Sequence, residues 1–468
     1  MMRAFAKPVA SCVLFAVAAS AGAQDAAAPG APEEASEHAA APELTTLRPY
    51  GPPAQDAQIL REPAPIAIPD PLDIAAALAA ATHPIVGAAE AEADALDADL
   101  RVARWQRYPS VSVEALAATE GSSFADQDGF ALNAVLEQPI WAGGRISGEI
   151  DRARASLRVG ENRVGEAQRD IVLRVVSAYY DYVLAAERVS VLESSLEEHN
   201  DLLAAIGRRV DQEVSPLADL TLGRSRTAQV ELDLTVTQEA RDSALLSLRE
   251  LTGGVVVEPE LPPSGIASTL PPEDIALAEA LACSPSLDAL TDLIAVAEAQ
   301  RAIAKAQIWP QLLLQVSQNE ITGARAALVL RAQLGPGQSQ ITAVEAGDAR
   351  IRRAIAQFGE TERVLRAQLR RDFVLVRAAE RRIVSGVIAA DAADEIIASY
   401  QRQFIAGRRS WLDVMNATRE AASARLSESD ARVGSAAATA RILALSCRWQ
   451  PDGADEIRSE QDGFGETQ

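Results

Sequence analysis

A heptad seam, meaning apolar residues spaced alternately four and three positions apart, runs from Ile171 to Val210. Its members are apolar with the exception of His199: Ile171, Val175, Ala178, Tyr182, Ala185, Val189, Leu192, Leu196, His199, Leu203, Ile206 and Val210. This spacing places one continuous apolar face along a helix, which is typical of coiled coils. A straight helix from Ile146 to Val210 is on the order of 100 Å long at 1.5 Å per residue. No ordinary globular domain contains a helix of that length.

A second seam runs from Ile351 to Phe404 with the same spacing. It consists mostly of Ile, Phe, Leu and Val, and its polar interruptions are Glu362, Glu380, Asp394 and Gln401. A shorter helical segment follows each seam, at residues 217–251 and 411–445. We predict that each long helix packs against the shorter one as a coiled-coil hairpin.

The two hairpins belong to a duplicated sequence. The 25 positions that separate Pro84 from Pro109 also separate Pro285 from Pro310, and each second proline follows an aromatic residue and precedes an alternating segment. The offset between the halves is 201 positions at these prolines and 194 further on, so one loop is about seven residues shorter in the second half. We predict two repeats of helix, β-hairpin, long helix, turn and helix, at residues 71–260 and 261–447.

Each repeat contains two segments with strand character. The predicted strands are residues 111–117, 130–140, 312–317 and 327–334, joined by loops at 120–129 and 319–323. Four strands cannot close into a barrel, and an open edge in lipid leaves backbone groups unpaired. Either the hairpins stay in water or several chains pool their strands, and three chains would supply twelve.

The N-terminus indicates export. Arg3 and Lys7 precede a short apolar segment at 9–19, and a small-residue cleavage site follows, so we predict a signal peptide at residues 1–23. Residues 24–70 are rich in Ala, Pro and acidic side chains and predict a disordered leader. Residues 448–468 predict a disordered acidic tail.

The net charge of −22 argues against nucleic acid as a partner. Cys283 and Cys447 follow the signal peptide, and export permits a disulfide between them. Two unpaired buried thiols are equally compatible with the sequence. The pairing therefore stays open.

Motifs of enzymes and metal sites are missing from the sequence. The three histidines, His38, His83 and His199, form no pair with metal-ligand spacing. GPGQSQ at 335–340 lacks the Lys–Ser/Thr pair of a phosphate-binding loop. We expect no cofactor, no metal and no enzymatic activity, and we expect His199 to form an interhelical hydrogen bond.

The segment QPIWAGGR at 138–145, followed by a helix from about Ile146, resembles the TolC family of outer-membrane ducts for efflux and type I secretion. AGRRSWLDVMNATRE at 406–420 and the repeated proline spacing strengthen the resemblance, which extends over about residues 70–447. It implies a mainly α fold with a small β part, in which a long α-helical coiled-coil barrel continues a trimeric twelve-stranded transmembrane β-barrel. It also implies localisation in the cell outer membrane, with the helices extending into the periplasm. The implied partners are two further copies, outer-membrane lipid, a periplasmic adaptor protein and an inner-membrane pump or ABC exporter.

The resemblance gives the glycines near the strand ends a role. We expect the chain to bend from barrel to tunnel twice, because proline ends strand pairing and glycine supplies backbone freedom. The expected bend residues are Pro139, Gly143, Gly144, Gly335 and Gly337. An ordinary strand-to-helix loop is the alternative.

The resemblance also implies that the two helix turns far from the membrane dock the adaptor. These tips are Gln212, Glu213, Val214 and Ser215 in the first repeat, and Ala406, Gly407, Arg408 and Arg409 in the second. We expect Ser410 to cap the next helix, with Asp413 in its first turn, and Ser215 and Pro216 to be N-cap and first helical residue. Glu213 stands where the family pattern has glycine. Two ordinary helix turns are the alternative.

Acidic rings can narrow the mouth of such a duct near the tip. Asp391, Asp394 and Glu395 precede Gly407 within about four turns, and Asp394 occupies a seam position. Since a buried unpaired carboxylate is costly, we expect Asp394 to face water in a cation-favouring constriction. A solvated outer face is the alternative. A periplasmic adaptor and a structural coiled-coil envelope protein are the other functions considered, and the transported substrate cannot be read from the sequence.

Overall fold

The computed structural model describes residues 67–118, 129–255, 260, 265–319, 323–332 and 339–451. All of them belong to one compact unit, Glu62–Gln468. The predicted signal peptide lies outside the described residues, as do most of the predicted leader and tail. Two predicted boundaries need correction, because Ala67 and Ile68 at one end and Trp449 at the other are buried in the core.

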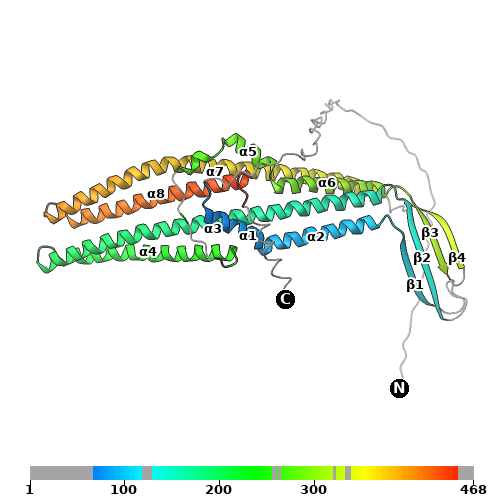
Figure 1. Cartoon of the computed structure of the whole chain (residues 1–468), viewed down its shortest axis with the longest axis horizontal. Coiled ribbons are helices and arrows are strands. Elements are labelled where there is room, and N and C mark those ends of the chain that lie inside the picture. Colours follow the sequence, from blue (N-terminus) through cyan, green and yellow to red (C-terminus); the bar gives the residue numbers. More distant parts are fainter. Residues whose placement is uncertain are drawn as a thin grey trace, which may run out of the picture. The chain divides into compact units, whose positions relative to one another are not determined.

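Two long helices dominate the fold (Figure 1). They are α3 (Arg145–Asp211) and α7 (Ser339–Ile405), each of 67 residues. The shorter helices α4 (Leu217–Leu251) and α8 (Trp411–Leu445) have 35 residues each. The helix α4 packs against α3, and α8 packs against both α7 and α3. The predicted coiled-coil hairpins are therefore confirmed.

The predicted seam of α3 is the buried side of that helix, and none of its twelve members is exposed. The seam of α7 is confirmed only in part. Leu365, Leu369 and Phe373 are buried, but Ile355 and Val387 are exposed. The buried stripe of α7 passes through small neighbours such as Ala354, Ala379 and Ala393 instead, because a 3.6-residue helix drifts away from a strict seven-residue repeat.

Short helices precede each hairpin of strands. They are α1 (Asp70–Thr82) and α2 (Pro84–Trp105) in the first repeat, and η1 (Ile266–Thr269), α5 (Glu273–Ala282) and α6 (Pro285–Ala306) in the second. The helices α2 and α6 pack along α3, and α6 also contacts α7. Among the described residues no single helix is long and apolar enough to span a membrane, whereas the bent pairs α1–α2 and α5–α6 meet that criterion jointly by length and composition.

The strands form one antiparallel sheet in the order β1-β2-β3-β4. They are β1 (Ser110–Ala118), β2 (Gly129–Trp141), β3 (Gln311–Asn319) and β4 (Gly323–Arg331). Pairing of β2 with β3 joins the two repeats. The predicted bounds of the last strand, 327–334, are wrong, since pairing begins at Gly323 directly opposite Asn319. Gly323 has φ +64°, which lets the chain turn at once into the strand.

Candidate channel wall and helical tips

The sheet has one apolar and one mostly polar face. Cross-strand partners share a face, so the pairing register assigns each side chain. The apolar face holds two glutamines, Gln138 and Gln318, and otherwise Val111, Val113, Ala115, Leu132, Ala134, Leu136, Leu312, Leu314, Val316, Ala324, Ala326, Leu328 and Leu330. Val113 is 65% exposed and Leu330 is 67% exposed. Such a surface needs either lipid or another protein to cover it.

The opposite face carries mostly polar side chains: Ser110, Ser112, Glu114, Asn133, Glu137, Gln315, Ser317, Arg325 and Arg331. Arg331 and Glu137 form an ion pair of 3.3 Å across it. Within the described strands, β1 and β4 are edge strands that each have a single neighbour. The sheet is therefore amphipathic, and both of its edges are open.

The chain bends where β2 ends. The register of β2 against β3 shifts between Pro139 and Trp141. Gly143 and Gly144 then adopt left-handed φ values of +60° and +91°, and α3 starts at the next residue. A Cβ atom on Gly143 would lie 2.8 Å from Cβ of Trp309, so this glycine also permits close packing against the end of α6. Gly335 and Gly337, the expected second bend, lie outside the described residues.

The two helical tips have equivalent backbones. Glu213 has φ +60° and Gly407, 194 positions later, has φ +70°. The first tip therefore makes the turn that its sequence disfavours, with a glutamate in the left-handed region. Gln212, Val214 and Ser215 complete that turn, and Val214 is exposed.

The N-termini of the two helices that follow the tips, α4 and α8, differ from each other. Ser410 caps α8 as expected, because its Oγ accepts a hydrogen bond of 3.2 Å from the Asp413 backbone N–H. The expectation for α4 is wrong. Its N-cap is Pro216, which has no capping side chain, so Ser215 is not the N-cap and Pro216 is not the first helical residue.

A buried cluster that the sequence analysis did not predict holds the two tips together. Phe404, Trp411 and Met415 of the second repeat form a buried cluster with Leu202 and Ile206 of the first. The Arg209 guanidinium also lies 5.2 Å from the Phe404 ring centre. In the second tip, Ala406 and Arg408 are exposed, while Arg409 lies 4.0 Å over the ring of Tyr400. The heptad seams of α3 and α7 both extend into the tip region, so the seams were the sequence signal for the cluster.

The expected constriction residues Asp391, Asp394 and Glu395 are all exposed on α7. The carboxylate of Asp394 pairs with Arg425 of α8, a partner that the sequence analysis did not identify. Arg425 also lies 3.8 Å from Glu198 of α3, so one cation connects three helices. Burial raises the pKa of the Glu198 carboxyl, and the charge of Arg425 opposes that rise.

Further ion pairs join the repeats along α3 and α8. Arg188 and Asp430 form a bidentate pair with both contacts at 2.9 Å, and Glu187 accepts from Arg432. His199, by contrast, does not make the expected interhelical bond. It is buried, and its Nδ1 lies 2.7 Å from the Ser195 carbonyl oxygen of the same helix. Across the described parts of the chain, no cluster of three or more His, Cys, Asp and Glu side chains has the arrangement of a metal site.

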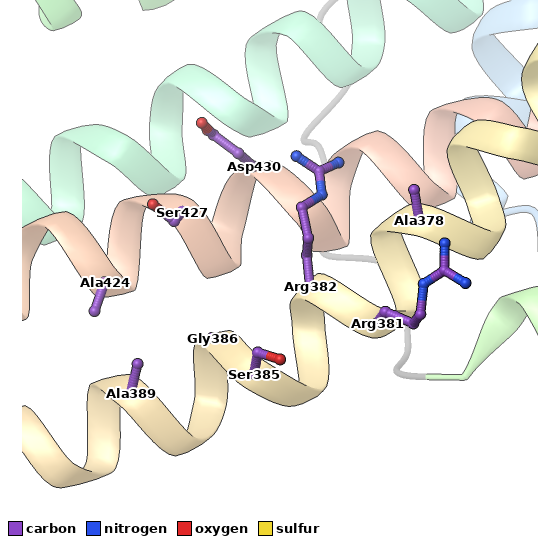
Figure 2. A pocket seen from close by; sticks show the side chains of 9 residues that line it. All are labelled: Ala378, Arg381, Arg382, Ser385, Gly386, Ala389, Ala424, Ser427 and Asp430. Carbon is purple, nitrogen blue, oxygen red and sulfur yellow. The ribbon is translucent and has the colours of Figure 1, made fainter.

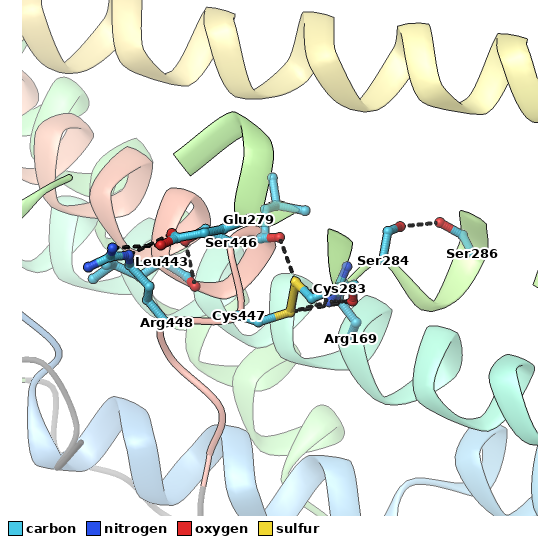
Figure 3. The surroundings of a disulfide bond; sticks show 10 residues. Arg169, Glu279, Cys283, Ser284, Ser286, Leu443, Ser446, Cys447 and Arg448 are labelled. Atoms are coloured by element: carbon cyan, nitrogen blue, oxygen red, sulfur yellow. Dashed lines mark hydrogen bonds and ion pairs between the residues drawn. A yellow bond between two sulfur atoms is a disulfide. The ribbon is translucent and has the colours of Figure 1, made fainter. Parts of the chain in front are cut away.

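Cys283 and Cys447 form a disulfide, which settles the pairing that the sequence left open (Figure 3). It joins the C-cap of α5 to the turn just after α8. Arg169 of α3 donates to the Cys283 carbonyl oxygen at 2.9 Å and contacts Cys447 Sγ at 2.8 Å. Burial lowers the pKa of this guanidinium. Just beyond, the Trp449 indole donates to Asp73 of α1 at 2.6 Å.

Comparison with known families identifies one match. The family described as outer membrane efflux protein matches residues 75–254, within the first repeat. No curated protein matches the chain by sequence.

Several solved structures share the fold. A membrane protein from Pseudomonas aeruginosa is 16% identical with a TM-score of 0.70, over 81% of this chain and 93% of that chain. The outer membrane protein VceC from Vibrio cholerae is 18% identical with a TM-score of 0.68, over 80% and 96%. The CmeC outer membrane channel of Campylobacter jejuni is 12% identical with a TM-score of 0.70, over 84% and 89%. At these identities the likeness shows the fold.

Proposed function

Because residues 75–254 match the outer membrane efflux protein family and the chain has the fold of solved outer-membrane channels, we propose that it is a subunit of a trimeric outer-membrane duct. The duct serves efflux or type I secretion. The chain carries no catalytic step in this function and acts as a conduit.

The observation that supports this proposal most strongly is the amphipathic open sheet. Lipid tolerates a strand only when every backbone group is paired, so an edge such as β1 or β4 needs another strand beside it. Three copies supply twelve strands, enough for a closed barrel. The apolar face is then turned to lipid and the polar face, with Glu137 and Arg331, to water in the lumen.

The helices extend the duct away from the membrane. The 67 residues of α3 or α7 span on the order of 100 Å, which suits a passage through the periplasm. The tips at 212–215 and 406–409 then lie at the far end from the sheet and dock a periplasmic adaptor, through which an inner-membrane pump or ABC exporter is coupled. The exposed Arg408 and Val214 offer a charged and an apolar contact for that partner.

Outer-membrane fractionation and planar bilayers test the duct. We expect the full-length protein to float with outer-membrane vesicles, to run as a heat-modifiable trimer and to conduct ions in a bilayer. A protein that stays in the soluble periplasmic fraction and does not conduct would rule the duct out. It would favour the structural coiled coil or the adaptor instead.

We also propose that Asp391, Asp394 and Glu395 line the narrow mouth of the duct. Three copies would place rings of carboxylates there, which favour cations over anions. Arg425 offsets the charge of Asp394, so Asp391 and Glu395 supply most of the negative potential at the mouth. Asp391→Asn with Glu395→Gln is therefore expected to lower cation selectivity in bilayer recordings. Asp394→Ala removes the acidic partner of Arg425 and is also expected to lower the cation selectivity. Unchanged reversal potentials in both variants would place these residues on the outer face.

A further inference from the structure

Three helix ends meet the sheet at one place, which we call the junction. It consists of residues 104–109 at the end of α2, 138–147 between β2 and α3, and 305–311 at the end of α6. The Arg145 guanidinium donates to the side-chain oxygen of Gln106 at 3.5 Å, which joins α3 to the segment after α2. Gly143 lies directly against Trp309, which joins the same bend to the end of α6. The three segments therefore form one surface on the helix side of the sheet.

The junction is basic, although the net charge of the chain is −22. Its charged residues are Arg104, Arg107, Arg145 and Lys305, and its sequence contains no Asp or Glu. Arg104, Arg107 and Lys305 are exposed. Within the ranges that the structure describes, none of the four cations has a carboxylate partner. A local reversal of charge that the fold does not neutralise favours an anionic partner.

Trp141 relates the junction to the apolar face of the sheet. It pairs with Leu312, so the register places it on the apolar face, and it is 47% exposed. As the last residue of β2, it lies at the rim of that face on the helix side. Trp105, Tyr108 and Trp309 are also exposed at the junction.

The position of this rim fits the boundary between acyl chains and headgroups. The strands β1, β3 and β4 have nine residues each, about the length of a tilted strand that crosses the hydrocarbon layer. Trp and Tyr concentrate where that layer meets the headgroups. If the apolar face lies in lipid, as proposed above, the cations of the junction lie at the level of the headgroups in the leaflet nearest the helices.

A hollow of about 390 Å³ opens beside Trp141 at the bend between β2 and α3. Its lining includes an apolar wall and two polar side chains: Pro139, Ile140, Trp141 and Ile146, with Arg107 and Ser147. The Gln138 side-chain amide donates to the Arg107 carbonyl oxygen at 3.0 Å, which fixes the backbone that carries this arginine. The volume lies in the range of small-ligand pockets, and a guanidinium matches the geometry of phosphate. The hollow therefore combines a cation for a phosphate with an apolar wall for the glycerol and acyl ester attached to it.

A larger groove between α7 and α8 also contains arginines but lacks the other features (Figure 2). Its volume is about 710 Å³, and Arg381 and Arg382 of α7 line it together with Asp430 of α8. None of its described lining residues is aromatic, and the groove lies along the long helices instead of at the sheet. It therefore provides a control surface with exposed arginine and without the apolar rim.

We propose that the hollow at the bend between β2 and α3 binds the phosphate of an anionic phospholipid in the leaflet nearest the helices. Arg107 contacts the phosphate, and Trp141 lies against the glycerol and the first acyl carbons. The other cations of the junction attract neighbouring headgroups of the same charge. This inference rests on the proposed function, because only a sheet inserted in a membrane meets such a lipid. It adds the charge of the lipid, the leaflet and the residues that select it.

Mass spectrometry of the intact, detergent-purified full-length protein tests the site. The protein is titrated with phosphatidylglycerol and, separately, with phosphatidylethanolamine of the same acyl chains. We expect the wild type to prefer phosphatidylglycerol and to retain one molecule per chain. Arg107→Gln should weaken the binding of phosphatidylglycerol about fivefold, since a basic residue beside anionic lipid contributes a factor of that order, and should change the binding of phosphatidylethanolamine little.

Two further variants separate charge from geometry and from position. Arg107→Lys keeps the charge but loses the planar guanidinium, so its preference for phosphatidylglycerol should fall between those of wild type and Arg107→Gln. Arg381→Gln is the matched control, because it removes one exposed arginine from the groove between α7 and α8. It should bind both lipids as the wild type does.

The same spectra distinguish the possible failures. A monomeric mass for the wild type would overturn the proposed duct. A trimeric wild type that binds the two lipids equally would overturn this site alone, and so would an equal loss in Arg107→Gln and Arg381→Gln. Glycerol phosphate, which has the phosphate without acyl chains, should not be retained at concentrations at which phosphatidylglycerol saturates. Its retention there would indicate a site for soluble phosphate and would overturn the assignment to lipid.

Discussion

Removing the disulfide between Cys283 and Cys447 is expected to destabilise the chain substantially. The two cysteines are 164 positions apart, so the bond closes a very long loop in the unfolded chain. The loop-entropy relation gives about 5 kcal/mol for a loop of this length. An unfolding entropy of about 2.1 cal/mol/K per residue over residues 67–449 amounts to about 800 cal/mol/K, so the midpoint should fall by about 6 °C.

The assay is thermal unfolding followed by circular dichroism at 222 nm on detergent-solubilised protein. Wild type is compared with Cys283→Ser/Cys447→Ser, each with and without reductant. The serine Oγ retains an acceptor for Arg169, so that hydrogen bond is not the variable. Reductant should lower the wild-type midpoint to that of the double variant and leave the double variant unchanged. Midpoints within 1 °C of each other in all four samples would refute the reasoning.

Four further predictions concern local structure. Gly143→Ala should cost at least about 1–2 kcal/mol, because it forces a left-handed alanine against Trp309, and a lower thermal midpoint would show this. Ser410→Ala should destabilise by about 1 kcal/mol through loss of the α8 cap, whereas Glu213→Gly should stabilise by about 1 kcal/mol by relieving a left-handed glutamate; chemical denaturation measures both. Burial raises the pKa of Tyr179 to about 12, with its backbone hydrogen bond to Glu260 opposing the shift. The unfolded chain loses this proton near pH 10 and the folded chain near 12, so stability should fall across that interval, and less steeply in Tyr179→Phe.

Helical periodicity predicted most of the fold. The bounds of α4 and α8 agree with the predicted segments, and α3 extends by one residue at each end. Long helices are readable because dozens of residues repeat one pattern. The strands were less well predicted, since a two-residue period over nine positions is a short signal that does not fix where pairing starts. The position of Gly323 opposite Asn319 depends on the neighbouring strand β3.

The sequence supplied candidate site residues but not their contacts. Sequence placed Asp394 at a seam position, yet nothing in the sequence pairs it with Arg425, 31 residues later on another helix. The same holds for the disulfide, whose two cysteines come together only when the turn between α5 and α6 meets the end of α8. Contacts between helices depend on how each helix is rotated about its axis and on how far it is shifted along its neighbour. The residue pattern of a single helix does not specify either quantity.

The contact of Trp449 with α1 has a consequence for biogenesis. The indole is buried in the main core cluster and bonds to Asp73 of α1, 376 positions earlier, so this contact forms only after residue 449 has been synthesised. A chain shorter than 449 residues keeps the packing of α1 on α3 but lacks the indole that completes the cluster around α1. A premature stop a few codons before Trp449 would therefore leave part of the α1 surface uncovered in the finished polypeptide.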